Sequence, residues 1–267
     1  MNKYIILLSL SSLLVADTLS FGVISPIDVN IMQKKISPLI KYLEKETGHK
    51  INFHSGRDYE DTIEKFSDST YHLGYIGPAP YILATNKNKN LNILAGISSS
   101  KQGTSQSEII VKKGSSLKSL DQLEGKVMAY GSPYSTLSYF LPKYMLSQKK
   151  IDTKLKNEHF LGGHDRVAEY IIMGRYDAGA VKSSVASAYS KYIDVIASSE
   201  QIHDFSVVAN KELDQKIQDD IQKALYRLKD KSVLQSINKS ATGFTQRVDS
   251  DYDNLRVIME KVNQYTK

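Results

Sequence analysis

The segment 130–142, YGSPYSTLSYFLP, has the residue types of an anion-binding site. A predicted strand ends at Gly131, and Ser135 and Thr136 then begin a helix. The first amides of a helix have no partner within it and point outward at the positive end of the helix dipole. Together with the two hydroxyls they favour a tetrahedral oxyanion such as a phosphoryl group, with no lysine needed. The simpler alternative is that Ser135 only caps the helix.

A second candidate is the segment 161–181, in which His164 begins a predicted helix directly after two glycines. Glycines allow the backbone to approach a ligand closely. The imidazole could donate a hydrogen bond to an oxyanion, act as a general base or only cap the helix. Asp177 lies beyond this helix at the start of a predicted strand, and we expect its role to be mainly structural.

A third candidate is the pair Gly77 and Pro78, which follows a predicted strand and precedes a predicted helix. We expect amides at this helix start to be exposed. Tyr59, Tyr75 and Tyr81 could add phenol hydroxyls, although a tyrosine more often forms part of a packed wall.

The sequence lacks the common enzyme motifs. It contains no nucleophile elbow, no zinc-protease helix motif, no P-loop and no dinucleotide fingerprint after a strand. Its six histidines show no i, i+4 pair, so a histidine metal site has no support from spacing. We therefore expect binding without turnover, with no cofactor and no metal. An enzyme using His164 and Asp177 as acid and base is the weaker alternative.

Composition limits the class of protein. The 267 residues are 41% hydrophobic and 24% charged, which is typical of a globular chain with one large domain or two lobes. The absence of cysteine excludes disulfides, thiolate metal sites and a cysteine-linked lipid anchor. The net charge of +6 comes from lysines scattered among acidic residues, so nucleic-acid binding is not indicated.

Residues 1–16 have the layout of an export signal. Lys3 precedes an apolar run over 5–15, and Leu14 and Ala16 suit a cleavage site. The run is too short to span a bilayer comfortably, which disfavours a retained anchor. We expect a soluble mature protein that begins near Asp17 and, in a bacterium with two membranes, resides in the periplasm.

Alternating strand and helix patterns predict an α/β fold. In 36–48 the apolar residues fall at i, i+3, i+4 and i+7, and Gly48 stands where a helix-ending glycine belongs. Strands are predicted at 19–24, 50–55, 72–76, 91–97, 107–113, 158–161, 176–181, 193–197 and 205–209. Helices are predicted at 36–48, 58–66, 135–148, 164–174, 212–229 and 250–265.

Several segments in this order resemble the phosphate/phosphite/phosphonate-binding proteins of bacterial ABC importers. The resemblance covers most of the mature chain and includes a Gly-Pro-x-x-Tyr turn, an Asp-Leu-x-Gly-Lys stretch, an anion loop, and Gly-x-His-Asp and Gly-x-x-Asp-Ala segments. The matching stretches are 21–29, 38–48, 74–84, 119–142, 162–165 and 174–180.

The resemblance implies a bilobal type II periplasmic-binding-protein fold, with two Rossmann-like lobes that close on the ligand around two crossover strands. The crossovers would lie near 107–112 and 204–210. The first lobe would comprise 17–108 and 209–267, and the second 109–208.

The resemblance also implies the ligand-binding residues. Tyr59 matches the family's tyrosine of the first lobe, Ser135 and Thr136 its anion loop, and His164 its histidine donor. The full expected set is Tyr59, Gly77, Pro78, Ser105, Ser135, Thr136, Leu137, Ser138, His164 and Asp165.

This chain departs from the family at several of these places. Leu137 and Ser138 stand where the family has Ser-Gly, and Ser105 stands where many members have tyrosine. Ser184 and Phe205 occupy places where aminoalkylphosphonate binders tend to have carboxylates. Since burying an ammonium without a carboxylate is costly, we expect phosphate, phosphite or a small alkylphosphonate rather than aminoethylphosphonate.

These observations predict a periplasmic solute-binding protein that captures a small phosphorus oxyanion and delivers it to an inner-membrane ABC permease. We expect a monomer. The alternatives are a ligand-sensing subunit of a membrane receptor, such as a sensor kinase, and a binder of a different small anion.

Overall fold

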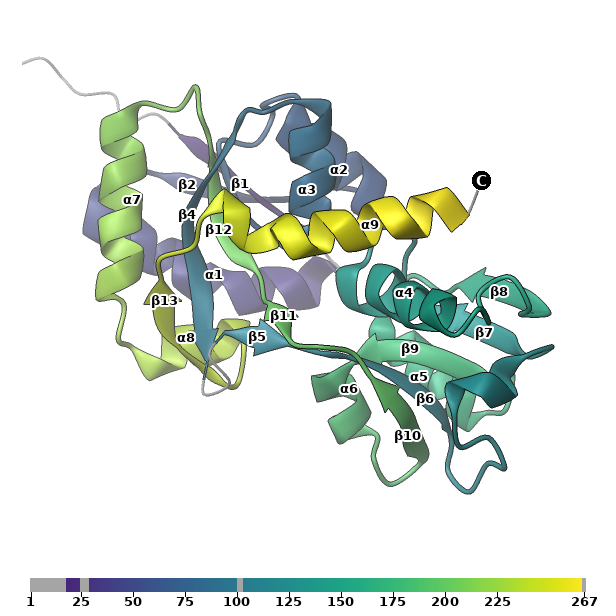
Figure 1. Ribbon diagram of the computed structural model, residues 1–267. Coiled ribbons are helices and arrows are strands. Elements are labelled where there is room, and N and C mark those ends of the chain that lie inside the picture. The colour runs from purple at the N-terminus through teal and green to yellow at the C-terminus, as the bar shows by residue number, and fades with distance from the viewer. Residues whose placement is uncertain (1–17, 25–28, 100–102, 266–267) are drawn as a thin grey trace, which may run out of the picture.

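The structure is a computed structural model that describes residues 18–24, 29–99 and 103–265, and these form two α/β lobes (Figure 1). The export signal predicted at residues 1–16 lies outside the described residues, as do Ser25 and Pro26 of the predicted first loop. Among the described residues, no helix has the length and apolar character that crossing a membrane requires.

The first lobe is built on a six-stranded sheet. Its strands lie in the order β13 (Ala241–Thr245), β4 (Leu91–Ser99), β12 (Ser206–Asn210), β3 (Leu73–Ile76), β1 (Leu19–Val23) and β2 (Ile51–Ser55). β3, β1 and β2 run parallel, whereas β12 is antiparallel to both of its neighbours. Alternate side chains of a strand face opposite sides, so each face of this sheet has its own apolar layer.

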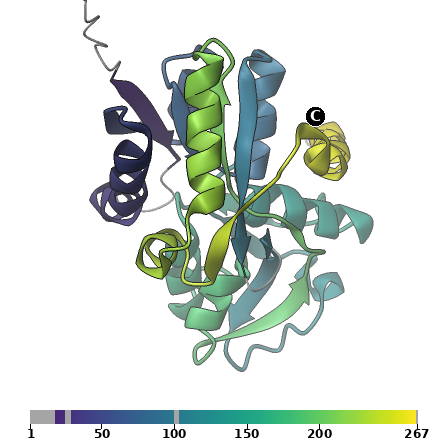
Figure 2. The ribbon, with the colours of Figure 1, turned by 90° about the vertical axis from the view of Figure 1, so that its left-hand side faces the viewer.

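Helices cover both faces of this sheet. The faces are distinguished by two apolar clusters, one containing Val207 and Ala209 and the other Val208. The first packs against α1 (Val29–Thr47), α7 (Gln215–Arg227) and α8 (Lys231–Ile237). The second packs against α2 (Tyr59–Ser67), α3 (Pro78–Lys87), the short turn η3 (Asp249–Tyr252) and α9 (Asp253–Tyr265). Figure 2 looks onto α7, with α1 and α9 to opposite sides of it.

The second lobe has a five-stranded sheet. Its order is β10 (Ile193–Ser198), β6 (Ser107–Lys112), β9 (Ala178–Lys182), β7 (Val127–Tyr130) and β8 (Asn157–Phe160). One face packs against η1 (Leu120–Leu123) and α4 (Leu141–Gln148), and the other against α5 (His164–Ile172) and α6 (Ser183–Ala188). The π-helical turn η2 (Thr136–Phe140) leads into α4.

Two short strands join the lobes. β5 (Thr104–Ser105) and β11 (Ile202–His203) pair antiparallel where the chain passes between the sheets (Figure 1). The predicted crossovers at 107–112 and 204–210 are displaced from this point. β6 pairs wholly within the second sheet and β12 wholly within the first, so the chain changes sheets a few residues before each predicted crossover.

Most predicted elements are present, and α1 is the largest difference. It begins at Val29, whereas the prediction placed its start at Ile36. The prediction put Pro38 in the first turn, where proline is favoured. In the structure Pro38 lies inside the helix, where it removes a backbone hydrogen bond, and the buried apolar stripe of α1 holds the helix on the sheet. Gly48 does end this helix, with φ of 75°.

Several short elements were not predicted. They are α6, α8, β5, β11 and β13. Each has seven or fewer residues, which is too few to show a repeating apolar pattern.

The C-terminal helix α9 connects the lobes by packing. It follows β13 of the first lobe and lies along α4 of the second lobe (Figure 1). Leu255 and Met259 of α9 share one apolar cluster with Leu137, Phe140 and Leu141 of the second lobe. The two lobes are therefore in apolar contact on this side.

We predict that Leu255→Ala destabilises the protein by about 2–5 kcal/mol, because it deletes a side chain that is 1% exposed and leaves a cavity. Val257→Ala on the same helix is the control, since Val257 is 47% exposed and its loss should cost under about 0.5 kcal/mol. Denaturant unfolding measures both. Equal effects of the two substitutions would contradict the packing of α9.

Candidate functional site

A cavity of about 510 Å³ lies between the lobes. Its wall is formed by α1, α2, α3, η2, α5, the end of β9, α6, the end of α8 and the β11–β12 connection. Eight of the ten predicted ligand-binding residues line it: Tyr59, Gly77, Pro78, Ser135, Thr136, Leu137, His164 and Asp165. Ser105 and Ser138 do not. The fold thus brings three separate candidate segments to one cavity.

Ser135 forms the corner at the start of η2. Its side chain is buried, and its Oγ accepts a hydrogen bond from the amide of Ser138 at 3.1 Å. The predicted capping role is therefore present. Within the part of the chain that the structure describes, the amides of Thr136 and Leu137 have no backbone partner, so they are available to an anion at this helix start.

Tyr59 connects the first lobe to this corner. Asp58 caps α2, and Tyr59 is the first residue of that helix. Burial raises the pKa of Tyr59, and a side-chain hydrogen bond with Ser135 partly offsets this. The Tyr59 phenol therefore lies beside the Ser135 hydroxyl, and both line the cavity.

Thr136 makes a second contact across the cleft. Its Oγ1 accepts from the amide of Ala79, in the first turn of α3, at 2.9 Å. A hydroxyl has one donor and two acceptor lone pairs, so Thr136 can still donate to a ligand.

This contact changes the role expected of Gly77 and Pro78. The first turn of α3 contains Pro78 and Pro80, which have no N–H, and its Ala79 amide is bound to Thr136. The predicted row of exposed amides is therefore wrong. Gly77 instead provides room, since a Cβ there would lie 3.2 Å from the Phe205 ring.

His164 is held in one protonation state. Its Nδ1 accepts from the backbone N–H of Lys182 at 3.0 Å. Burial, and next the nearby charge of Lys182, lower the pKa of His164 to about 4. The ring is therefore neutral near pH 7, and because Nδ1 accepts, its proton is on Nε2. His164 is a neutral hydrogen-bond donor to the cavity, and the bond at Nδ1 also makes it a poor general base there.

Ser138 has a structural role, contrary to the prediction. Its Oγ accepts from the amide of Gly131 at 2.6 Å and donates to the carbonyl of Ala180 at 2.5 Å. The side chain is fully buried, so the hydroxyl ties the residue after β7 to the middle of β9 and does not line the cavity.

Ser105 is also displaced from its predicted role. It lies in β5, which with β11 forms the connection between the lobes that we call the hinge. Its Oγ donates to Asp204 Oδ2 at 2.8 Å. Asp204 in turn pairs with Lys182, with Nζ and Oδ2 2.9 Å apart, and both of these charged residues line the cavity.

Lys182 and Asp204 line the cavity but are not among the residues predicted from the sequence. Lys182 directly follows a predicted strand and Asp204 directly precedes another, and ligands of α/β proteins bind at strand ends, which was the available signal. Ser184 and Phe205, the two places where a carboxylate was sought, do line the cavity, and the carboxylate of Asp204 stands next to Phe205.

Leu137 and Asp165 contribute less than predicted through their side chains. Leu137 packs into the apolar cluster shared with α9. Asp165 is exposed and interacts with the Tyr189 hydroxyl, whose pKa it helps to raise. A carboxylate would repel an oxyanion, so Asp165 is better suited to stabilising the start of α5.

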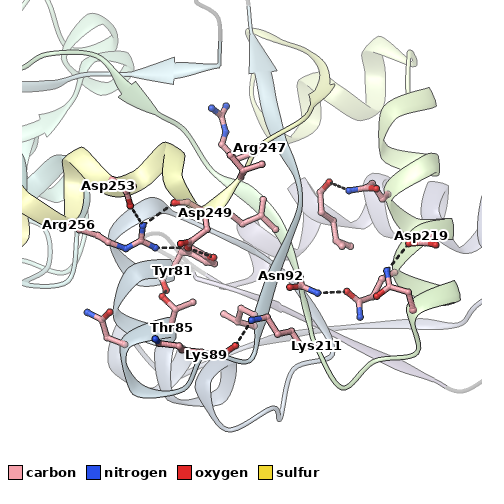
Figure 3. Close-up of a pocket in the computed structure, with 18 residues that line it drawn as sticks. Tyr81, Thr85, Lys89, Asn92, Lys211, Asp219, Arg247, Asp249, Asp253 and Arg256 are labelled. Atoms are coloured by element: carbon pink, nitrogen blue, oxygen red, sulfur yellow. Dashed lines mark hydrogen bonds and ion pairs between the residues drawn. The ribbon is translucent and has the colours of Figure 1, made fainter.

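A second cavity, of about 730 Å³, lies on the first lobe beside β4, α3 and α7 (Figure 3). It contains none of the ten predicted residues. Tyr81, considered above as a hydroxyl donor, lies here and donates to Asp249 at 2.7 Å. Arg256 pairs with Asp249 and Asp253, and Lys211 donates to the carbonyl of Lys89. Because these polar groups satisfy one another, the interlobe cavity is the better candidate site. The described residues contain no group of three or more His, Cys, Asp or Glu placed to hold a metal ion.

Comparison with known proteins gives one family. The family profile described as the periplasmic substrate-binding protein of phosphonate ABC transporters matches residues 21–252. The phosphate-import protein PhnD of Mycolicibacterium smegmatis is 26% identical over 175 residues. That alignment covers 61% of this chain and 54% of the relative, so the chain spans about half the length of the curated relative that it matches.

Two solved structures share the fold. PhnD1 of Prochlorococcus marinus, solved with methylphosphonate, is similar with a TM-score of 0.83 and 20% identity, over 92% of this chain and 98% of that one. The binding component of a phosphonate ABC transporter from Pseudomonas aeruginosa has a TM-score of 0.82 and 16% identity, over 94% and 89%.

We predict that Ser138→Ala lowers the free energy of unfolding by about 1–3 kcal/mol, because the buried amide of Gly131 and carbonyl of Ala180 each lose their partner. Ser116→Ala, at an exposed position of the same lobe, should have little effect. Urea unfolding measures both, and equal stability of the two variants would contradict the structural role of Ser138.

We also predict that His164 makes stability depend on pH. Its pKa is about 4 in the folded chain and near 6.5 when unperturbed, so between these values the unfolded chain binds a proton that the folded chain does not. Acidification from pH 6.5 to 4 should therefore lower the free energy of unfolding.

His164→Gln removes the titratable imidazole. The free energy of unfolding of this variant should therefore fall less steeply than that of the wild type between pH 6.5 and 4, and the two curves should run parallel above pH 7. His54→Gln, at an exposed histidine, should keep the wild-type slope. Identical pH profiles for H164Q and the wild type would show that His164 is not held neutral.

Proposed function

Since this chain belongs to the periplasmic substrate-binding proteins of phosphonate ABC transporters, we propose that it binds a small phosphorus oxyanion between its two lobes and delivers it to a membrane permease. The profile match over residues 21–252 covers most of both lobes, so the assignment to the family applies to the whole described fold.

The observation that best supports the proposed ligand is a set of neutral donors in the interlobe cavity. Thr136 Oγ1 and His164 Nδ1 each accept a hydrogen bond from a protein backbone amide, and the Tyr59 phenol lines the same cavity. The protons of Thr136 and His164 are thereby left for an acceptor in the cavity. A phosphorus oxyanion has several acceptor oxygens, and charged hydrogen bonds of this kind contribute about 1.5–3 kcal/mol each.

Both lobes contribute to this donor set. Tyr59 belongs to the first lobe, and Thr136 and His164 belong to the second. A ligand bound to all three would hold the lobes together about the β5–β11 hinge, which gives a transporter a way to recognise the loaded protein.

The ligands favoured are phosphate, phosphite and small alkylphosphonates. The names of the relatives agree with this range, since one is a phosphate-import protein and another was solved with methylphosphonate. The proposed partners are this small ligand and an inner-membrane permease, with the monomeric protein located in the periplasm after removal of the export signal. The proposed activity is binding without turnover.

We predict that Tyr59→Phe combined with Thr136→Val weakens binding of the preferred oxyanion by about a hundredfold or more, because two charge-assisted hydrogen bonds are lost with little change in side-chain volume. Titration calorimetry against phosphate, phosphite, methylphosphonate and sulfate measures this. The matched control is Tyr192→Phe combined with Thr153→Val, at exposed positions of the second lobe, and it should keep the wild-type affinity.

Two results would overturn the proposal. One is a wild-type protein that binds none of the three phosphorus oxyanions. The other is unchanged affinity in the double variant, which would place the ligand elsewhere.

A further inference from the structure

An ion pair between a half-buried lysine and a buried aspartate forms part of the wall of the interlobe cavity. Lys182 Nζ lies 2.9 Å from Asp204 Oδ2, and both residues line the cavity. The Asp204 side chain is 6% exposed and that of Lys182 is 25% exposed. A carboxylate removed from water to this extent needs a counter-charge or strong donors, because its desolvation is otherwise not offset.

Both carboxylate oxygens of Asp204 accept hydrogen bonds from the protein itself. Oδ2 accepts from Ser105 Oγ at 2.8 Å and from Lys182 Nζ. Oδ1 accepts from the backbone N–H of Phe205 at 2.9 Å. The partners come from the first hinge strand, from the second lobe and from the residue that follows Asp204. The carboxylate therefore has a counter-charge, and a hydrogen bond on each oxygen, before any ligand arrives.

The ion pair lies beside the oxyanion donors. The backbone N–H of Lys182 donates to His164 Nδ1, and the Lys182 charge helps to lower the pKa of that histidine. On the other side, Asp204 helps to raise the pKa of Tyr75, whose ring packs 4.9 Å from that of Phe205 in the cavity wall. A group attached to a phosphorus oxyanion at His164 would thus meet a carboxylate that already has an ammonium partner.

We propose that Lys182 determines specificity by supplying from the protein the positive charge that Asp204 requires. This inference rests on the proposed function. With Lys182 in place, a ligand ammonium finds no free carboxylate and is repelled by a cation, so ligands without an amino group are selected over aminoalkylphosphonates. The same ranking of ligands was expected from the sequence because Ser184 and Phe205 are not carboxylates. The structure gives a different cause, because the carboxylate is present and neutralised.

The proposal makes a gain-of-binding prediction. Lys182→Met leaves Asp204 as a buried carboxylate without a counter-ion, and the ammonium of 2-aminoethylphosphonate can then replace the lost charge. Methylphosphonate lacks that ammonium, so its binding leaves the carboxylate unpaired and should weaken. The ratio of the two affinities therefore reports the role of Lys182, whereas a purely structural role would weaken both ligands together.

Titration calorimetry with methylphosphonate and 2-aminoethylphosphonate tests this on the wild type, K182M, and K182M combined with Asp204→Asn. We expect the wild type to favour methylphosphonate, and K182M to shift the ratio by at least tenfold toward 2-aminoethylphosphonate. The double variant removes both charges and should return the ratio toward that of the wild type. Lys113→Met is the control, since it breaks the exposed Lys113–Asp194 pair of the same lobe and should not move the ratio.

A K182M protein that binds oxyanions with the wild-type ratio would overturn the inference and leave the proposed function intact. If K182M does not fold, Lys182→Gln, which removes the charge and can still donate to Asp204, is expected to shift the ratio in the same direction, and an unshifted ratio there has the same meaning. A wild type that binds neither phosphonate nor phosphate would overturn the proposed function, and this inference with it.

Discussion

The hydrogen bond from the Ala79 amide to Thr136 Oγ1 joins the two lobes at the candidate site, and much of the site's geometry depends on it. Pro78 and Pro80 have no N–H, so Ala79 has the only amide in the first three residues of α3 that could donate to Thr136 Oγ1. Ala79 and Thr136 are both buried. A buried amide must be paired to avoid a penalty of about 1–3 kcal/mol, so the second lobe has to place a hydroxyl there. Because the Thr136 hydroxyl accepts this bond, its O–H proton can be donated to a ligand.

The same requirement explains the neutrality of the donor set. The Ala79 amide donates to Thr136 and the Lys182 amide donates to His164, so each of these two groups accepts from the protein and has a proton to donate. The charged groups of the cavity are arranged differently, because Lys182 and Asp204 neutralise each other. In the proposed function, recognition of an anion by neutral donors beside an internal ion pair would let the protein distinguish ligands by the charge of the group attached to phosphorus.

The sequence predicted much of this fold because its longer elements have clear periodic patterns. The stripe of Ile36, Leu39, Ile40 and Leu43 and the glycine at position 48 are local signals, and the structure has a helix over them. The short elements α8 and β13 and the hinge strands have no such pattern, and contacts with other parts of the fold stabilise their regular structure. The site was predicted in part for the same reason. Ser135 at a helix start is visible in the sequence, whereas the use of Ser138 by Gly131 and Ala180 is not.

By itself the sequence determined the α/β alternation, the absence of cysteine chemistry, and the hydroxyls and histidine that stand at helix starts. The tertiary structure decided which of them meet. Ala79 and Thr136 are 57 residues apart, and Lys182 and Asp204 are 22 apart, and only the packing of two sheets about the hinge brings each pair together. A polar group takes its role from what lies beside it once water is excluded, and that neighbour is set by packing rather than by local order along the chain.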